Sequence, residues 1–188
     1  DVRAIEVQNC GDGGAGSGSL RDAIATAGSG ETVDLSQLPA KCGSLHSTIT
    51  LLNGELVVPQ DYLVLRGPSD GSVAITPSNG ATHRVLNHTG AGVLSISRLN
   101  IANGKVLSTD VNAFGGCIQS KGTVLITSSS IENCKVIASG SGLGFGGALF
   151  SEGGLALIDS TISGSIASRG GGGIASLGDL TLINSAVE

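Results

Sequence analysis

The sequence predicts an all-β fold, a right-handed parallel β-helix (a β-solenoid) with a short N-terminal capping helix. Four eight-residue segments, which begin at residues 94, 124, 155 and 180, carry apolar side chains at their first, third and eighth places. Paired glycines, followed two places later by Ile or Leu, recur at 114–118, 145–149 and 170–174. Because both patterns shift together, at intervals of 25 to 31 residues, we expect stacked coils.

The repeats also predict how the strands pair. Equivalent segments follow one another in the same direction, so like strands should pair in parallel. A parallel pair needs a long connection, which the rest of each coil supplies, and such connections are nearly always right-handed. Glycine supplies 31 of the 188 residues and is a weak helix former, which disfavours a long-helix protein.

The N-terminal cap segment, residues 1–35, contains the one helix that we expect, over 18–28. Ser19 is a suitable N-cap and Asp22, three places on, resembles the acidic partner of a capping box. Gly28 is expected to end the helix. Apolar residues line one face at helical spacing: Leu20, Ala23, Ile24 and Ala27. This helix should cover the open end of the solenoid core.

The rest of the single domain, 1–188, divides into irregular early coils at 36–91 and regular coils at 92–188. Short strand-like segments, separated by Pro and Gly turns, fill the early coils. In the regular coils, Ser128, Asp159 and Asn184 occupy the same place and should stack at one turn. The chain stops in mid-coil, so we expect its open end to be covered by further sequence or another subunit.

Composition argues against several classes of protein. The formal net charge is −5 and no Lys/Arg cluster exists, which gives nucleic-acid binding little support. The single Tyr and three Phe supply no stacking platform, which also argues against nucleic-acid binding. No apolar run approaches the ~20 residues of a membrane helix, so no transmembrane segment is expected.

The four cysteines are expected to form two disulfides. Cys10 and Cys42 flank the N-terminal segment, so a bridge between them would tie that segment to the first coil. Cys117 and Cys134 fall within one coil. The alternative is four buried free thiols. Two bridges would indicate an oxidising compartment, and thus an extracellular or bacterial outer-surface location.

No catalytic residue, metal site or cofactor can be assigned from the sequence. Glu132 and Asp159 lie on successive coils but at different places of the repeat, and the pair is better explained as solvated turns. His83 and His88 lack an evident third zinc ligand. The remaining candidates are scattered acids, two arginines that could line a groove or face solvent, and a glycine-rich corner: Asp12, Asp61, Asp70, Asp110, Arg66, Arg98 and 142–147.

Two motifs resemble known families. Residues 16–24, followed by 30–35, resemble the CSLREA-type entry segment of bacterial secreted right-handed β-helix proteins, with Gly18 or Ser19 where that segment has Cys. The Gly-Gly-x-Ile/Leu blocks resemble the repeats of polymorphic outer-membrane proteins, without their Phe-x-x-Asn partner. The whole chain is similar to choice-of-anchor surface proteins. This resemblance implies export to the cell surface or medium and no settled activity.

These observations favour a secreted or cell-surface β-solenoid that acts as a binding, adhesion or structural module. Rows of Ser, Thr and Asn would face a glycan or a surface protein. The alternative is a fragment of a polysaccharide lyase or glycoside hydrolase of the pectate-lyase-like superfamily. Ice binding is weaker still, because Thr127, Thr161 and Thr181 do not occupy one place of the repeat.

Overall fold

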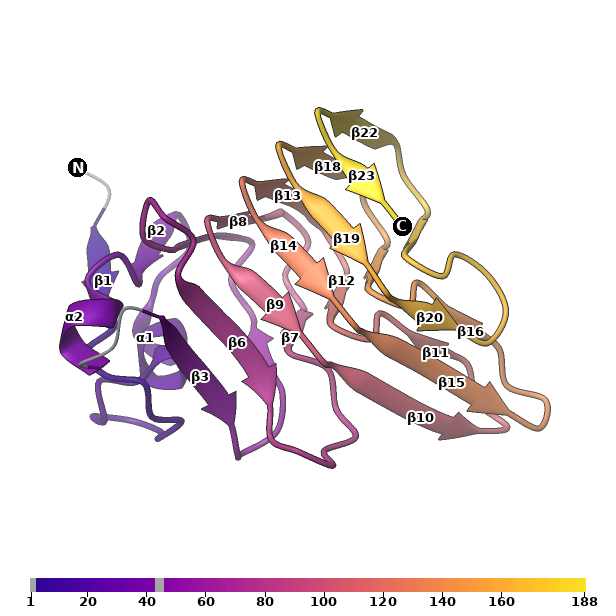
Figure 1. Ribbon diagram of the computed structural model, residues 1–188, viewed down its shortest axis with the longest axis horizontal. Coiled ribbons are helices and arrows are strands. Elements are labelled where there is room, and N and C mark those ends of the chain that lie inside the picture. Colours follow the sequence, from indigo (N-terminus) through magenta and orange to yellow (C-terminus); the bar gives the residue numbers. More distant parts are fainter. Residues whose placement is uncertain (1–2, 43–45) are drawn as a thin grey trace.

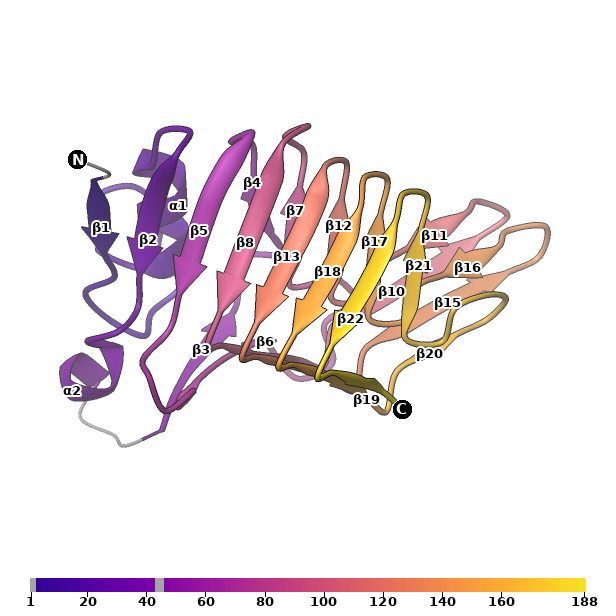
Figure 2. The ribbon, with the colours of Figure 1, turned by 90° about the horizontal axis from the view of Figure 1, so that it is seen from above.

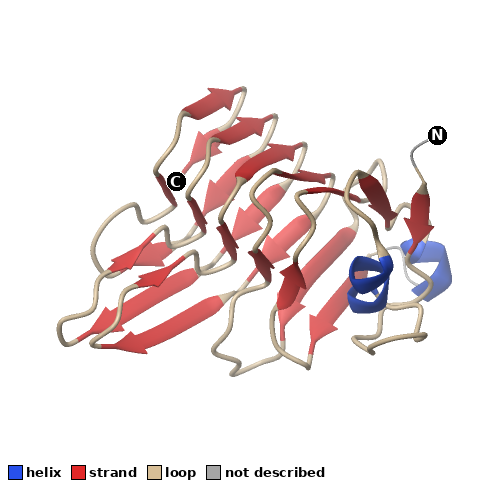
Figure 3. Cartoon of the chain, turned by 180° about the vertical axis from the view of Figure 1, so that it is seen from behind, coloured by secondary structure: helices blue, strands red, loops and turns tan. Residues whose placement is uncertain are grey.

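The protein is a parallel β-solenoid with two short helices at its N-terminal end (Figures 1 and 3). The computed structural model describes residues 3–42 and 46–188. The predicted parallel β-helix with a capping helix is therefore confirmed. No helix among the described residues is both long and apolar enough to cross a membrane.

Three parallel sheets form the walls of the solenoid (Figure 2). The seven-stranded sheet runs β1 (Ala4–Glu6), β2 (Glu31–Asp34), β5 (Tyr62–Arg66), β8 (Val93–Ser97), β13 (Thr123–Thr127), β18 (Leu155–Ile158), β22 (Leu180–Ile183). The six-stranded sheet runs β3 (Ser47–Leu51), β6 (Val73–Pro77), β9 (Asn100–Ala102), β14 (Ser130–Glu132), β19 (Thr161–Ser163), β23 (Ala186–Val187). The five-stranded sheet runs β4 (Leu56–Val58), β7 (Leu86–His88), β12 (Ile118–Ser120), β17 (Leu149–Ser151), β21 (Ile174–Ser176).

The register of the strands explains the eight-residue repeat. Leu94, Val124 and Leu155 are paired across neighbouring strands of the seven-stranded sheet, and all three side chains are buried. The eighth place of each repeat falls in the six-stranded sheet, where Ile101 and Ile131 are paired in the same way. Like residues therefore stack in the core, and their burial removes apolar surface from water. In the last coil the equivalent residues Leu180 and Val187 are 49% and 41% exposed.

The turn between these two sheets has the predicted polar column and a second column of serines. Ser128, Asp159 and Asn184 share a left-handed backbone conformation, with φ of 48°, 49° and 48°. Beside them, the amide of Ser129 donates to Oγ of Ser160 at 3.2 Å, and the amide of Ser160 donates to Oγ of Ser185 at 3.1 Å. Each serine hydroxyl thus accepts the amide of the preceding coil.

The N-terminal cap agrees with the prediction in kind but not in length. Helix α1 spans Leu20–Thr26, with Ser19 as its N-cap and the Ser19 Oγ accepting from the Asp22 amide. It ends before Gly28, because the amide of Gly28 is bonded to the Glu31 carboxylate instead. A second helix, α2 (Leu38–Cys42), was not predicted, since five residues carry too little periodicity to be recognised.

A projection from the solenoid is the main feature that the sequence did not reveal. Between the six- and five-stranded sheets, successive coils extend outward as β10 (Lys105–Thr109), β11 (Ala113–Phe114), β15 (Lys135–Ser139), β16 (Gly144–Phe145) and β20 (Ile166–Ala167). These strands pair in parallel as a three-stranded and a two-stranded sheet. We call residues 105–114, 135–145 and 166–170 the arm. It projects to one side of the solenoid (Figures 1 and 2).

Candidate functional site

The three phenylalanines of the chain lie together at the base of the arm. Phe114 lies on β11, Phe145 on β16 and Phe150 on β17. The ring centroids of Phe114 and Phe150 are 4.5 Å apart, and those of Phe114 and Phe145 are 6.0 Å apart with nearly parallel rings. Apolar aromatic surface is thus concentrated at one place on a protein that has little of it elsewhere.

The repeat itself positions two of the rings. Phe114 and Phe145 begin successive Phe-Gly-Gly blocks, and they are register partners in the β11–β16 pair. Gly115 and Gly146 then turn the chain back into the solenoid with φ of 57° and 64°. A Cβ at Gly115 would overlap the carbonyl oxygen of Ile118, so only glycine fits this corner.

The rings line a cavity of about 440 Å³, a volume typical of small-ligand sites. Its other walls come from Gln119, Glu152, Ala175, Ser176 and Leu177. We call these eight residues the phenylalanine groove. Leu177 is 75% exposed at the rim, whereas Phe150 is only 7% exposed. Among the described residues, no partner hydrogen-bonds the side chain of Gln119 or Glu152, so both are available to a ligand.

The floor of the groove continues along the outer face of the five-stranded sheet. Side chains alternate between the two faces of a strand. Ile118 and Leu149 therefore point into the core, while their neighbours Gln119 and Phe150 face outward. The register aligns Asn87, Gln119, Phe150 and Ala175 across four consecutive coils. The outward column thus runs parallel to the solenoid axis.

A charged cluster holds one end of this column. Arg84 Nη1 lies 2.8 Å from Glu55 Oε2, and Asn87 Nδ2 donates to Glu55 Oε1 at 2.7 Å. Arg84 also donates to the carbonyl oxygens of Phe114 and Gly115, both at 3.2 Å. The arginine therefore ties the arm to the sheet, and its charge is balanced by Glu55.

Both predicted disulfides are present. Cys10 is bridged to Cys42, and Cys117 to Cys134. Cys117 follows the first segment of the arm, 105–114, and Cys134 precedes the second, 135–145. Both are fully buried, so this bridge fastens the base of the arm from within. The Cys10–Cys42 bridge instead joins the N-terminal segment to α2.

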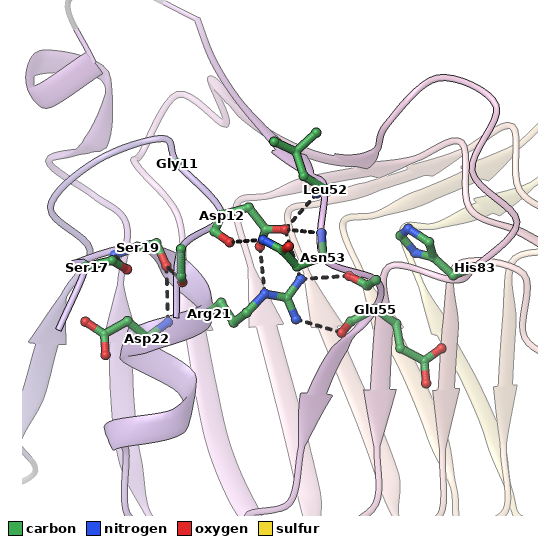
Figure 4. A network of polar contacts seen from close by, with 12 residues as sticks. Gly11, Asp12, Ser17, Ser19, Arg21, Asp22, Leu52, Asn53, Glu55 and His83 are labelled. Carbon is green, nitrogen blue, oxygen red and sulfur yellow. Dashed lines mark hydrogen bonds and ion pairs between the residues drawn. The ribbon is translucent and has the colours of Figure 1, made fainter. Parts of the chain in front are cut away.

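A second polar cluster, shown in Figure 4, joins the cap to the first coil. The buried Asp12 carboxylate accepts from Arg21 Nε at 2.8 Å and from the Leu52 and Asn53 amides at 2.7 and 2.8 Å. Burial alone would raise the pKa of Asp12, but these hydrogen bonds, with the Arg21 charge, hold that pKa below its usual value. Arg21 also donates to the Gly54 and Glu55 carbonyls. Because both partners are fully engaged, this cluster is a structural clasp.

The histidines and arginines considered from the sequence lie apart from the groove. His88 is buried, with Nδ1 at 2.7 Å from Ser120 Oγ and Nε2 at 2.9 Å from the Gln60 carbonyl, and burial lowers its pKa. His83 Nδ1 contacts the Arg84 carbonyl instead. Arg66 and Arg98 do line one polar cleft, beside α2, but Arg66 pairs with Asp34 at 2.7 Å. No group of three His, Cys, Asp or Glu in the described ranges is placed to hold a metal ion.

The meeting of the three phenylalanines was not predicted from the sequence. The signal available in the sequence was that Phe114 and Phe145 occupy the same place of the repeat, one coil apart. Phe150 gave no such signal, because its counterparts in neighbouring coils are Gln119 and Ala175. The three rings meet only in the folded structure, in which β11 and β16 of the arm lie beside β17 of the five-stranded sheet.

Comparison of the chain with protein-family models, with curated proteins and with solved structures found no match. The fold is therefore known from the structure itself. The likeness to CSLREA-type and choice-of-anchor proteins rests on the sequence motifs alone.

Proposed function

We propose that this protein is an extracellular β-solenoid module that binds a glycan in the phenylalanine groove. The observation that carries the proposal is the meeting of all three phenylalanines at one cavity, beside two polar side chains that have no hydrogen-bond partner among the described residues. Sugar rings present C–H faces that pack on aromatic rings, and hydroxyls that bond to amides and carboxylates. Gln119 and Glu152 supply those polar groups.

The extracellular location is supported by the two disulfides, which persist in oxidising compartments. The bacterial surface families that the motifs resemble would place the module on a cell surface or in the medium. A binding role also fits the rigid support of the groove. Its floor is a stacked sheet and its wall is held by Arg84 and the buried Cys117–Cys134 bridge.

An array of immobilised glycans tests the proposal. We expect the oxidised protein to bind at least one glycan, and Phe145→Ala to lose most of that signal. Tyr62→Ala is the matched control, because Tyr62 is the one other aromatic residue and lies exposed on β5, outside the groove. Equal losses in both variants, or no glycan bound, would refute a glycan site in the groove.

A further inference from the structure

The direction of the groove restricts the shape of its ligand. Asn87, Gln119, Phe150 and Ala175 face outward from four successive coils, which lie about 4.8 Å apart. This spacing is close to the length of one sugar in an extended β-linked chain. A linear glycan that lies along the solenoid axis therefore advances by about one coil for each sugar.

The charges in and beside the groove restrict the ligand further. Glu152 has no cationic partner among the described residues, and the charge of Arg84 is balanced by Glu55 at 2.8 Å. The protein as a whole has a formal net charge of −5. A polyanionic glycan would bring like charges together and leave its own carboxylates unpaired. The groove thus favours an uncharged chain.

Gln119 and its neighbours distinguish among uncharged glycans. The Gln119 side chain offers an amide donor and an amide acceptor, and no described residue uses either. On the next coil, Phe150 packs against Phe114 and provides an apolar wall. An acetamido group matches this pair, because it carries a complementary amide and a methyl group. A plain hydroxyl can also bond to the Gln119 amide, but it brings no methyl group to the apolar wall beside it.

From these features we propose that the phenylalanine groove recognises an uncharged, β-1,4-linked polysaccharide that carries N-acetyl groups and lies along the solenoid axis. This inference rests on the proposed glycan-binding function. It assigns the acetamido group to Gln119 and the apolar wall of Phe114 and Phe150, and the sugar faces to the outward column.

Calorimetry with three matched tetrasaccharides tests the inference. The N-acetylglucosamine, glucose and glucuronate tetramers share one β-1,4-linked backbone. The first differs from the second at the acetamido group, and the third is polyanionic. We expect the acetylated tetramer to bind about tenfold more tightly than the glucose tetramer, as for one well-made hydrogen bond with its methyl contact. The glucuronate tetramer should bind most weakly.

The variant Gln119→Leu separates this inference from the proposed function. It should reduce the tenfold preference to near equality, because it should weaken binding of the acetylated tetramer by a larger factor than binding of the glucose tetramer. Gln37→Leu, on the cleft beside α2, is the control and should keep the preference. Phe145-dependent binding without preference for the acetylated tetramer, or a preference that survives Gln119→Leu, overturns the inference alone. Failure of all three tetramers and of the glycan array overturns the proposed function as well.

Discussion

The ring of Phe114, on the arm, lies 4.5 Å from the ring of Phe150, on the sheet that forms the floor of the groove. This contact joins the arm of one coil to the five-stranded sheet of the next coil. Phe114 also stacks on Phe145, so the three rings act as one apolar surface. The position of the arm therefore sets the shape of the proposed binding site.

Arg84 is expected to control that position. Replacing it with Ala removes the hydrogen bonds to the Phe114 and Gly115 carbonyls and leaves Glu55 without its cation. We expect about 1–3 kcal/mol lower stability in urea denaturation and weaker glycan binding. Arg3→Ala is the control. The Arg3 side chain is 68% exposed and its ion pair with Glu31 is long, at 4.0 Å, so this variant should change stability by less than about 0.5 kcal/mol. Unchanged binding in Arg84→Ala would show that the arm does not depend on this contact.

The two disulfides should differ in their effect on binding. Paired Cys→Ser replacements at 117 and 134 open a bridge across 17 residues and should cost about 3 kcal/mol, together with weaker glycan binding. The same change at 10 and 42 opens a bridge across 32 residues and should cost a similar or larger amount. Because that bridge lies at the cap, binding by the folded protein should stay at the wild-type level. Similar binding losses in both variants would contradict a specific role for the bridge at the arm.

The serine column can be tested at Ser160. Its buried Oγ accepts from the Ser129 amide at 3.2 Å and donates to the Ile158 carbonyl at 2.8 Å. Ser160→Ala leaves the Ser129 amide without a partner, so we expect about 1–3 kcal/mol lower stability in thermal or urea unfolding. Ser95→Ala, on the outer face of β8, removes no hydrogen bond to a described residue and should be nearly neutral. Equal stability of the two variants would rule out the column as a source of stability.

Asp12 predicts an acid limit to stability. Its pKa is lower in the folded protein than the ordinary value of 3.8, so folding favours the ionised form. The stabilisation is complete above the unfolded pKa and is lost as pH falls through the folded pKa. Asp12→Asn should be less stable at pH 7, and its stability should fall less steeply below pH 4 than that of the wild type. Parallel stability profiles of the two proteins would contradict the account of the clasp.

The regular coils could be predicted from the sequence because their signals are local and repeated. Leu94, Val124 and Leu155 recur at one place, and the register pairs them in the core as expected. The arm could not be predicted, because β10 and β15 carry aliphatic residues that are partly exposed, such as Leu107 and Ile137. From the sequence alone, these residues cannot be distinguished from aliphatic residues of the core. The groove depends on where the arm turns back, and that follows from three-dimensional packing around Gly115 and Gly146.

Fluorine NMR offers the most direct test of the central claim, because the three phenylalanines all lie in the groove and the single tyrosine does not. Protein labelled with 4-fluorophenylalanine should give three signals, and a second sample labelled with fluorotyrosine should give one. On titration with the N-acetylglucosamine tetramer, we predict that all three phenylalanine signals shift with one shared Kd while the Tyr62 signal stays in place. Binding detected by calorimetry with stationary phenylalanine signals would contradict the claim that the phenylalanine groove is the glycan site.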